Sequence, residues 1–223
     1  MRNSVRLEGP GEEIPGSAST LQLRNEEARR IARLIRPHLD HYVGLYDERK
    51  YPPKNYNSAR REFRKPTVAG PGAIENALLW KWGHIGKAAI PHAHRELITH
   101  IQGAWAEIAG TMPQSAPAVF DLLEQRIGPG RFITVAFLLH LVRPTEVPIV
   151  DQHNFRAVQH LVRQIRPSWT SKRRPTSYSD LETVAIFMTT VLRAWHQSMP
   201  VSAPDERTLD KFLMMYGKKL KTM

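Results

Sequence analysis

One stretch of the chain places a carboxylate where it could do chemistry. The segment VPIVDQHNFRAV, residues 147–158, contains Asp151 between an apolar run and a run with helical spacing. An Asp at such a boundary predicts a helix N-cap, because its side chain accepts hydrogen bonds from free backbone N–H groups. A helix N-terminus also favours an ionised carboxylate, the form that stabilises a developing cation. Asp151 is therefore a candidate cap and a candidate catalytic residue.

A glycine-rich turn lies upstream of Asp151. Residues 119–158 show an amphipathic helix, the turn IGPG, an apolar helix, a Pro-containing connection and a further amphipathic helix. Gly128 and Gly130 flank the turn, and glycines let backbone amides approach a phosphate because no Cβ intervenes. The next helix is expected to begin at about Arg131, so its N-terminus also points at the turn. This pattern predicts an anchor for a DNA backbone.

The unit resembles the helix-hairpin-helix superfamily of DNA glycosylases over about residues 119–165, although its hairpin, RIGPGRF, is a degenerate form. In that family the hairpin grips a DNA strand and a carboxylate stands at the start of a following helix. Asp151, Gln152, His153 and Arg156 occupy the corresponding stretch. The resemblance implies a two-lobed helical fold with a helix-hairpin-helix element, and Asp151 as the catalytic residue for excision of a modified or damaged base.

The resemblance also bears on the reaction. Bifunctional members carry a Lys just after the hairpin, which attacks the sugar and later cleaves the strand. Aligning TVAFLLHL with that helix puts Thr134 at the Lys position. The implied chemistry is monofunctional: water attacks the anomeric carbon while Asp151 activates it or stabilises the oxocarbenium-like sugar, leaving an abasic site. A noncatalytic helical DNA- or RNA-binding protein and a bifunctional glycosylase/lyase using another amine remain as alternatives.

The charge balance favours a polyanionic partner. Lys and Arg number 32 and Asp and Glu 21, which gives a formal net charge of +11. Such an excess is typical of proteins that bind nucleic acid. One of the two densest basic runs is SKRRPTS; the other contains Arg60, Arg61, Arg64 and Lys65. The predicted DNA-binding residues are Gly128, Gly130, Arg131, Thr134, Arg156, Arg173 and Arg174.

A base extruded from the stack needs aromatic faces and polar groups that read its edge. The segment ALLWKWGHIGK offers both, and the predicted base pocket comprises Trp80, Trp82, His84, Lys87 and His153. The two tryptophans lie two residues apart on a helix and point in different directions, so one of them is expected in the core. The base itself is not specified: repair of damaged DNA and defence against phage DNA with glucosylated hydroxymethylcytosine both fit the resemblance.

Other features narrow the class of protein. The chain has no Cys, which excludes disulfides, Cys-ligated zinc, iron–sulfur clusters and a thiol nucleophile. His92, His94 and His100 lack the HExxH pattern, so no metal is expected. No cofactor is expected either. The longest apolar run, 132–142, is too short to span a bilayer, and the N-terminal segment lacks an apolar signal core. We expect a monomer in a bacterial or archaeal cytosol, without a membrane partner.

Hydrophobic periodicity predicts an all-α fold of about eight helices, with residues 1–20 as a flexible tail and 21–223 as one domain. Ser19 or Thr20 is expected to cap the first helix, which Pro37 ends or bends. Ser179 or Asp180 is expected to cap the helix that starts near residue 180. The polar connection before residue 70 is expected to hold a short basic helix.

Overall fold

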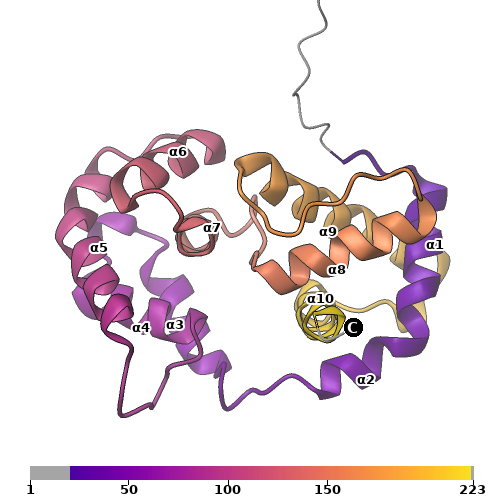
Figure 1. Ribbon diagram of the computed structural model, residues 1–223, viewed down its shortest axis with the longest axis horizontal. Helices are drawn as coiled ribbons and strands as arrows, with labels where there is room; N and C mark the ends of the chain where they lie inside the picture. Colours follow the sequence, from indigo (N-terminus) through magenta and orange to yellow (C-terminus); the bar gives the residue numbers. More distant parts are fainter. Residues whose placement is uncertain (1–20, 222–223) are drawn as a thin grey trace, which may run out of the picture.

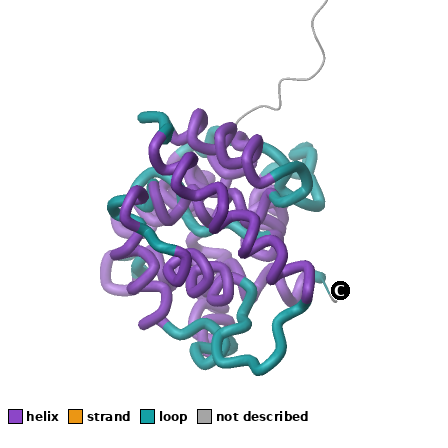
Figure 2. Tube along the Cα trace, turned by 90° about the vertical axis from the view of Figure 1, so that its left-hand side faces the viewer, coloured by secondary structure: helices purple, strands orange, loops and turns teal. Residues whose placement is uncertain are grey.

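The computed structural model describes residues 21–221, and within that range the chain forms helices and loops without a strand (Figures 1 and 2). The all-α prediction is confirmed. The α-helices are α1 Asn25–Ile35, α2 Leu39–Gly44, α3 Pro53–Glu62, α4 Pro71–Lys81, α5 His92–Gly110, α6 Ala116–Ile127, α7 Phe132–Val142, α8 Gln152–Ile165, α9 Tyr178–Ser198 and α10 Glu206–Leu220. Single turns of 3-10 helix lie at Arg36–His38, Pro66–Val68 and Pro200–Ser202.

The helices gather in two groups in Figure 1, with α3–α7 on the left and α1, α2 and α8–α10 on the right. The chain passes between the groups twice, in the α2–α3 loop and in residues 143–151. On the right, α10 packs against α8 and α2, and α1 packs against α9; on the left, α6 packs against α7 and α3 against α4. Asp151 stands at the end of the second crossing, where the chain enters α8.

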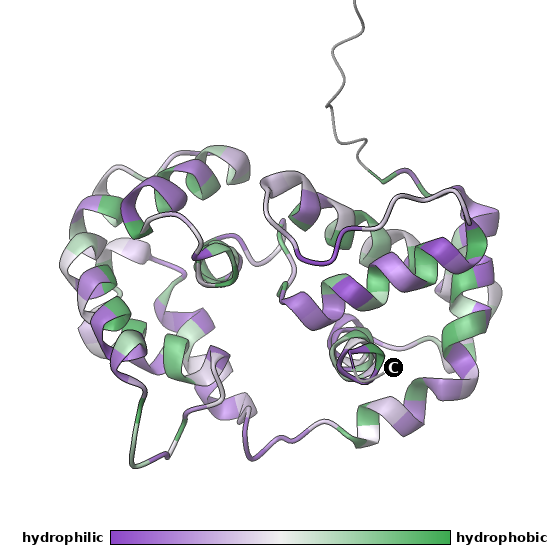
Figure 3. Cartoon of the chain, viewed as in Figure 1, coloured by the Kyte–Doolittle hydropathy of each residue, from purple (hydrophilic) through white to green (hydrophobic). Residues whose placement is uncertain are grey.

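The apolar helix predicted after the glycine turn is α7. Every residue from Thr134 to Leu141 is buried. A helix that is hydrophobic on all sides is stable only when other elements surround it. By contrast α8 alternates between green and purple in Figure 3, as an amphipathic helix does, and it buries one face against α10.

Helices α8 and α10 approach each other unusually closely at Gly217. A Cβ built on this glycine would lie 1.8 Å from the backbone oxygen of His153 and 3.2 Å from the backbone nitrogen of Ala157. No side chain fits in that space, so only glycine allows the contact. This contact fixes α10 against the first turn of α8, beside Asp151.

Some features of the helices were predicted correctly from neighbouring residues in the sequence. Pro37 interrupts the first helical segment, as predicted. The helix α1 ends at Ile35, a 3-10 turn that contains Pro37 follows, and α2 begins at Leu39. The short basic helix expected before residue 70 is α3. The flexible tail and the caps assigned to Ser19 and Thr20 lie outside the described residues.

The cap predicted for α9 was wrong. The N-cap is Ser177, not Ser179 or Asp180. Asp180 lies inside the first turn and accepts the backbone N–H groups of Thr176 at 2.8 Å and Ser177 at 3.1 Å. An acidic side chain at this third helical position reaches back to the cap residue, so the helix starts earlier than the position of the Asp suggests.

Candidate active site

Asp151 is the N-cap of α8, as its position in the sequence predicts. Its Oδ1 accepts the backbone N–H groups of His153 at 2.7 Å and Asn154 at 2.9 Å. The Asn154 side-chain oxygen in turn accepts the backbone N–H of Asp151 at 2.7 Å. Within residues 21–221 the second carboxylate oxygen of Asp151 takes part in no hydrogen bond. One oxygen is thus held by the helix and the other is left for a partner.

A small cavity of about 20 Å³ adjoins Asp151 and brings two further charged side chains to it. Lys81, the last residue of α4, donates to the Val150 carbonyl at 3.3 Å. Its ammonium lies 5.5 Å from the centre of the Phe137 ring. It forms no ion pair with any residue that the structure describes. Removal from solvent lowers the pKa of Lys81, although the negative charges of Asp151 and Asp210 act in the opposite direction.

Asp210, on α10, is the second acidic group of this cavity. Its Oδ1 accepts a hydrogen bond from Asn154 Nδ2 at 3.2 Å, so Asn154 connects the two acids. Burial, together with the negative charge of Asp151, raises the pKa of Asp210 to about 7, although Lys81 and the hydrogen bond from Asn154 act in the opposite direction. Asp210 therefore keeps a proton far more readily than an exposed carboxylate does.

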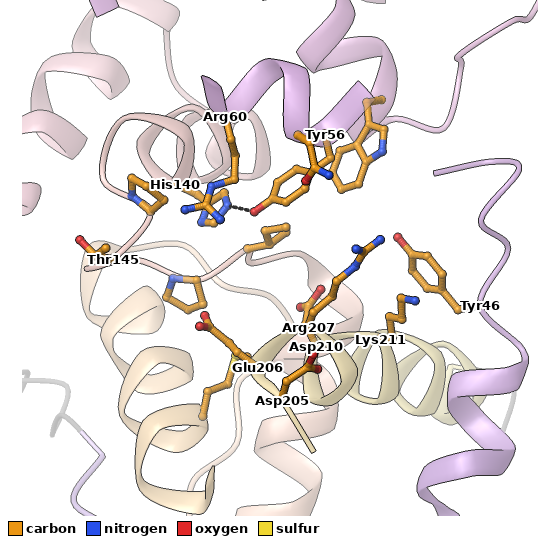
Figure 4. A pocket seen from close by; sticks show the side chains of 16 residues that line it. Tyr46, Tyr56, Arg60, His140, Thr145, Asp205, Glu206, Arg207, Asp210 and Lys211 are labelled. Atoms are coloured by element: carbon orange, nitrogen blue, oxygen red, sulfur yellow. Dashed lines mark hydrogen bonds between the residues drawn. The ribbon is translucent and has the colours of Figure 1, made fainter. Parts of the chain in front are cut away.

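A larger cavity of about 570 Å³ adjoins the small one, and Tyr46, Trp80, Ile149 and Asp210 line both (Figure 4). Its wall carries aromatic rings. Tyr56 and Trp80 are stacked with centroids 5.0 Å apart, and Trp80 donates its indole N–H to the Pro52 carbonyl at 3.0 Å. Such a volume lies within the range of cavities that hold small organic molecules. Trp80 is buried and is also stacked with Phe137, so the rings of this wall pack on one another.

His140 and Tyr56 form a neutral pair at one side of the large cavity (Figure 4). His140 Nδ1 lies 2.7 Å from the Val147 carbonyl, which only accepts, so this nitrogen carries the proton. His140 Nε2 then accepts from the Tyr56 hydroxyl at 2.7 Å. Burial lowers the pKa of His140 to about 4 and raises the pKa of Tyr56 to about 12. Neither group changes its charge near neutral pH.

A second hollow, of about 420 Å³, collects several residues from the predicted DNA-binding set. Gly130, Arg131, Thr134 and Arg174 line it together with Gln152, the neighbour of Asp151. Thr134 therefore does not line the cavity of Asp151, where the alignment with bifunctional glycosylases placed it; it lies one hollow away, buried in α7. Gly128 and Arg173 are not among the lining residues.

The turn predicted at Gly128 and Gly130 lies between α6 and α7. Gly128 has φ 96° and Gly130 has φ 76°, a region that side chains with a Cβ rarely adopt. A Cβ at either position would meet nothing within 4 Å, so the surface in front of the turn is open. Arg131 is the N-cap of α7, close to the position expected.

The predicted base pocket is only partly assembled. Of its five residues, Trp80 alone lines the cavities beside Asp151. Trp82 lines the second hollow and is stacked on His94, with ring centroids 4.1 Å apart. His84 Nε2 lies 3.1 Å from His94 Nδ1, and Lys87 is exposed.

Two predicted residues on the first turns of α8 have structural contacts. His153 donates its backbone N–H to Asp151, and its side-chain Nδ1 lies 3.3 Å from the guanidinium of Arg156. Arg156 also donates to the Gly217 carbonyl at 3.0 Å, which ties α8 to α10. Both side chains therefore support the frame that positions Asp151.

Sequence reasoning missed the residues that complete the cavities: Tyr46, Tyr56, Lys81, His140 and Asp210. Lys81 lies between Trp80 and Trp82, which were predicted to line the base pocket, so its position in the sequence could have indicated a place in the site. His140, a titratable residue inside an otherwise apolar helix, was a second signal, since a buried polar group needs partners. Asp210 gave none, because its partners come from distant parts of the chain.

No group of three or more His, Asp or Glu residues within residues 21–221 is arranged to hold a metal ion. No helix there combines the length and the apolar character needed to cross a membrane.

No protein-family model, curated protein or solved structure matches the chain.

Proposed function

We propose that the protein is a monofunctional DNA glycosylase, which hydrolyses the N-glycosidic bond of a modified or damaged base and leaves an abasic site. The observation that supports this most is the placement of Asp151: one oxygen is held by a helix N-terminus, and the residue lines a small cavity that adjoins a large aromatic one. The proposed setting is the cytosol of a bacterium or archaeon, with duplex DNA as partner and the protein acting as a monomer.

The chemistry follows from the charges. The base leaves the stack, enters the large cavity and packs against the aromatic wall that Tyr46 and Tyr56 help to form. The sugar then lies toward Asp151. As the bond from C1′ to the base lengthens, positive charge develops on the sugar, and the ionised Asp151 stabilises it. Water adds to C1′ and completes the hydrolysis.

The DNA strand is proposed to lie along the second hollow. Arg131 and Arg174 supply positive charge there, and the open turn at Gly128 and Gly130 offers backbone groups without side chains. In this reading α6 and α7 form the helix-hairpin-helix element. The two groups of helices act as two lobes, with the base entering between α3, α4 and α7 on one side and α10 on the other.

Mass spectrometry of released bases tests the proposal. The panel contains duplexes with deaminated, oxidised and alkylated bases, together with phage DNA carrying glucosylated hydroxymethylcytosine. Wild-type protein is expected to release one class of base and leave alkali-labile sites, and Asp151→Asn is expected not to. If nothing is released although the DNA is bound, the protein is a noncatalytic nucleic-acid-binding protein.

Lys81 favours a second candidate, a bifunctional glycosylase/lyase. An amine withdrawn from solvent and without an ion pair has a larger neutral fraction, which is its nucleophilic form. Lys81 lines the cavity of Asp151. The resemblance to bifunctional glycosylases had pointed to Thr134 as the position for a lysine there. Borohydride reduction of a mixture with an abasic duplex decides between the candidates. A lyase gives a trapped adduct that is lost in Lys81→Gln and kept in Lys54→Gln, which changes an exposed lysine on α3. Absence of any adduct supports the monofunctional reaction.

A further inference from the structure

Asp210 is placed to contact a bound base. It lines both the large cavity and the small cavity of Asp151, whereas Asp151 lines only the small one. Figure 4 shows Asp210 on α10, across the cavity from Tyr56 and His140. A base packed against the aromatic wall would therefore present its edge to Asp210, while its sugar lies toward Asp151.

The hydrogen bond of Asp210 uses only one of its two carboxyl oxygens. Asn154 holds its Oδ1 at 3.2 Å, and within residues 21–221 its Oδ2 has no hydrogen-bond partner. The same Asn154 accepts the backbone N–H of Asp151, so a single side chain sets the relative position of the two acids. The close contact at Gly217 holds α10, and with it Asp210, against the start of α8.

We propose that Asp210 is the acid that protonates the departing base, so that two carboxylates divide the work of one hydrolysis. This inference rests on the proposed glycosylase function and adds a second catalytic residue to it. Asp151 acts on the sugar as an anion, and Asp210 acts on the base as a proton donor. The substrate class that needs such a donor is a neutral modified base, because a cationic base leaves without protonation.

The step balances. The bond from C1′ to the base nitrogen breaks, and its electron pair goes to the base. The proton of Asp210 goes to a nitrogen or oxygen of that base, which leaves neutral. Water supplies the hydroxyl that bonds to C1′, and its remaining proton passes through solvent to restore Asp210.

The charges around Asp210 support this division. Burial and the negative charges of Asp151 and Glu206 raise the pKa of Asp210 to about 7, whereas Lys81 and the hydrogen bond from Asn154 lower it. Three cations, Arg60, Arg207 and Lys211, also line the large cavity; Lys211 is paired with Glu48 at 2.7 Å. A catalytic acid works best when its pKa lies near the working pH, because it then holds the proton and still releases it readily.

The first test needs no substrate. Infrared spectra of wild-type protein labelled with ¹³C in the Asp carboxyl groups, minus spectra of Asp210→Asn, report the protonation of Asp210 alone. We expect a protonated acid at neutral pH that ionises as the pH rises. Asp210 found fully ionised at about pH 6 would overturn the inference, whatever bases the protein releases.

The second test measures base release under single turnover from a duplex with hypoxanthine, which is neutral, and one with 7-methylguanine, which is cationic. Asp210→Asn is expected to slow release of the neutral base by roughly 10²-fold or more and release of the cationic base far less. It should also abolish the fall in rate that wild type shows as the pH rises through 7. Asp210→Glu should restore part of the rate.

The outcomes separate this inference from the proposed function. Equal loss on both duplexes, with an unchanged pH profile, means that Asp210 is structural and overturns the inference while the glycosylase stands. If the full panel yields no released base, the proposed function fails and the catalytic role of Asp210 fails with it. Asp121→Asn, which changes an exposed acid on α6, controls for the substitution itself.

Discussion

Replacing Asp151 by Asn separates its two roles, because Asn keeps the cap and loses the charge. The Asn side-chain oxygen can still accept the two backbone N–H groups that Oδ1 now accepts at 2.7 and 2.9 Å. Asn and Asp are about equally good N-caps. The remaining loss is the attraction between the carboxylate and the helix N-terminus, about 0.3–1 kcal/mol. We therefore expect a folded protein with a slightly lower melting temperature.

The effect on base release should be much larger. Removing a preorganised group that stabilises charge in a transition state costs roughly 10²–10³-fold in rate, or about 2.7–4 kcal/mol. The assay is single-turnover base release on the duplex that wild type processes best, with DNA affinity followed by fluorescence anisotropy. We expect the rate to fall by that factor while the affinity stays within about a factor of three of wild type.

Asp205→Asn is the control for the cap. Asp205 is the N-cap of α10 and accepts the Thr208 N–H at 2.7 Å, so the same substitution there reports the thermal cost of exchanging carboxylate for amide at a cap. A rate for Asp151→Asn within a few-fold of wild type, in a protein as stable as this control, would refute the catalytic assignment and leave Asp151 as a cap alone.

Three further outcomes are expected. Replacing Arg131 and Arg174 together by Gln should make the log–log salt dependence of DNA binding shallower by about 1.8, at about 0.9 per lost phosphate contact, measured by anisotropy; an unchanged slope would place the DNA elsewhere. Gly217→Ala should lower the melting temperature and slow base release, because its Cβ would lie 1.8 Å from a backbone oxygen of α8; a neutral effect would mean that the helices separate without cost. Arg166 holds the pKa of Glu27 at about 2, below its ordinary 4.5, so this pair stabilises the fold above about pH 4.5 and loses that effect toward pH 2. The stability gap between wild type and Arg166→Gln in urea unfolding should therefore narrow on acidification, and a constant gap would contradict the assignment.

Features that depend on near neighbours along the chain could be predicted before the structure was known. Helical periodicity predicted the all-α fold, and the apolar run predicted that α7 is surrounded. The position of Asp151 before an amphipathic run predicted its cap, because a cap is set by residues two or three positions away. Gly128 and Gly130 marked the turn between α6 and α7 for the same reason.

The side chains that share a cavity with Asp151 could not be predicted in this way. Lys81 comes from the end of α4 and Asp210 from the second turn of α10, and no local pattern links either residue to α8. Their meeting depends on how helices pack, above all on the close approach that Gly217 allows. The alignment placed Thr134 beside Asp151, but the packing of α7 puts it in the next hollow. The spacing of residues along a helix determines which face of the helix each residue occupies. Which other helix packs against that face depends on the shapes of all the helices together.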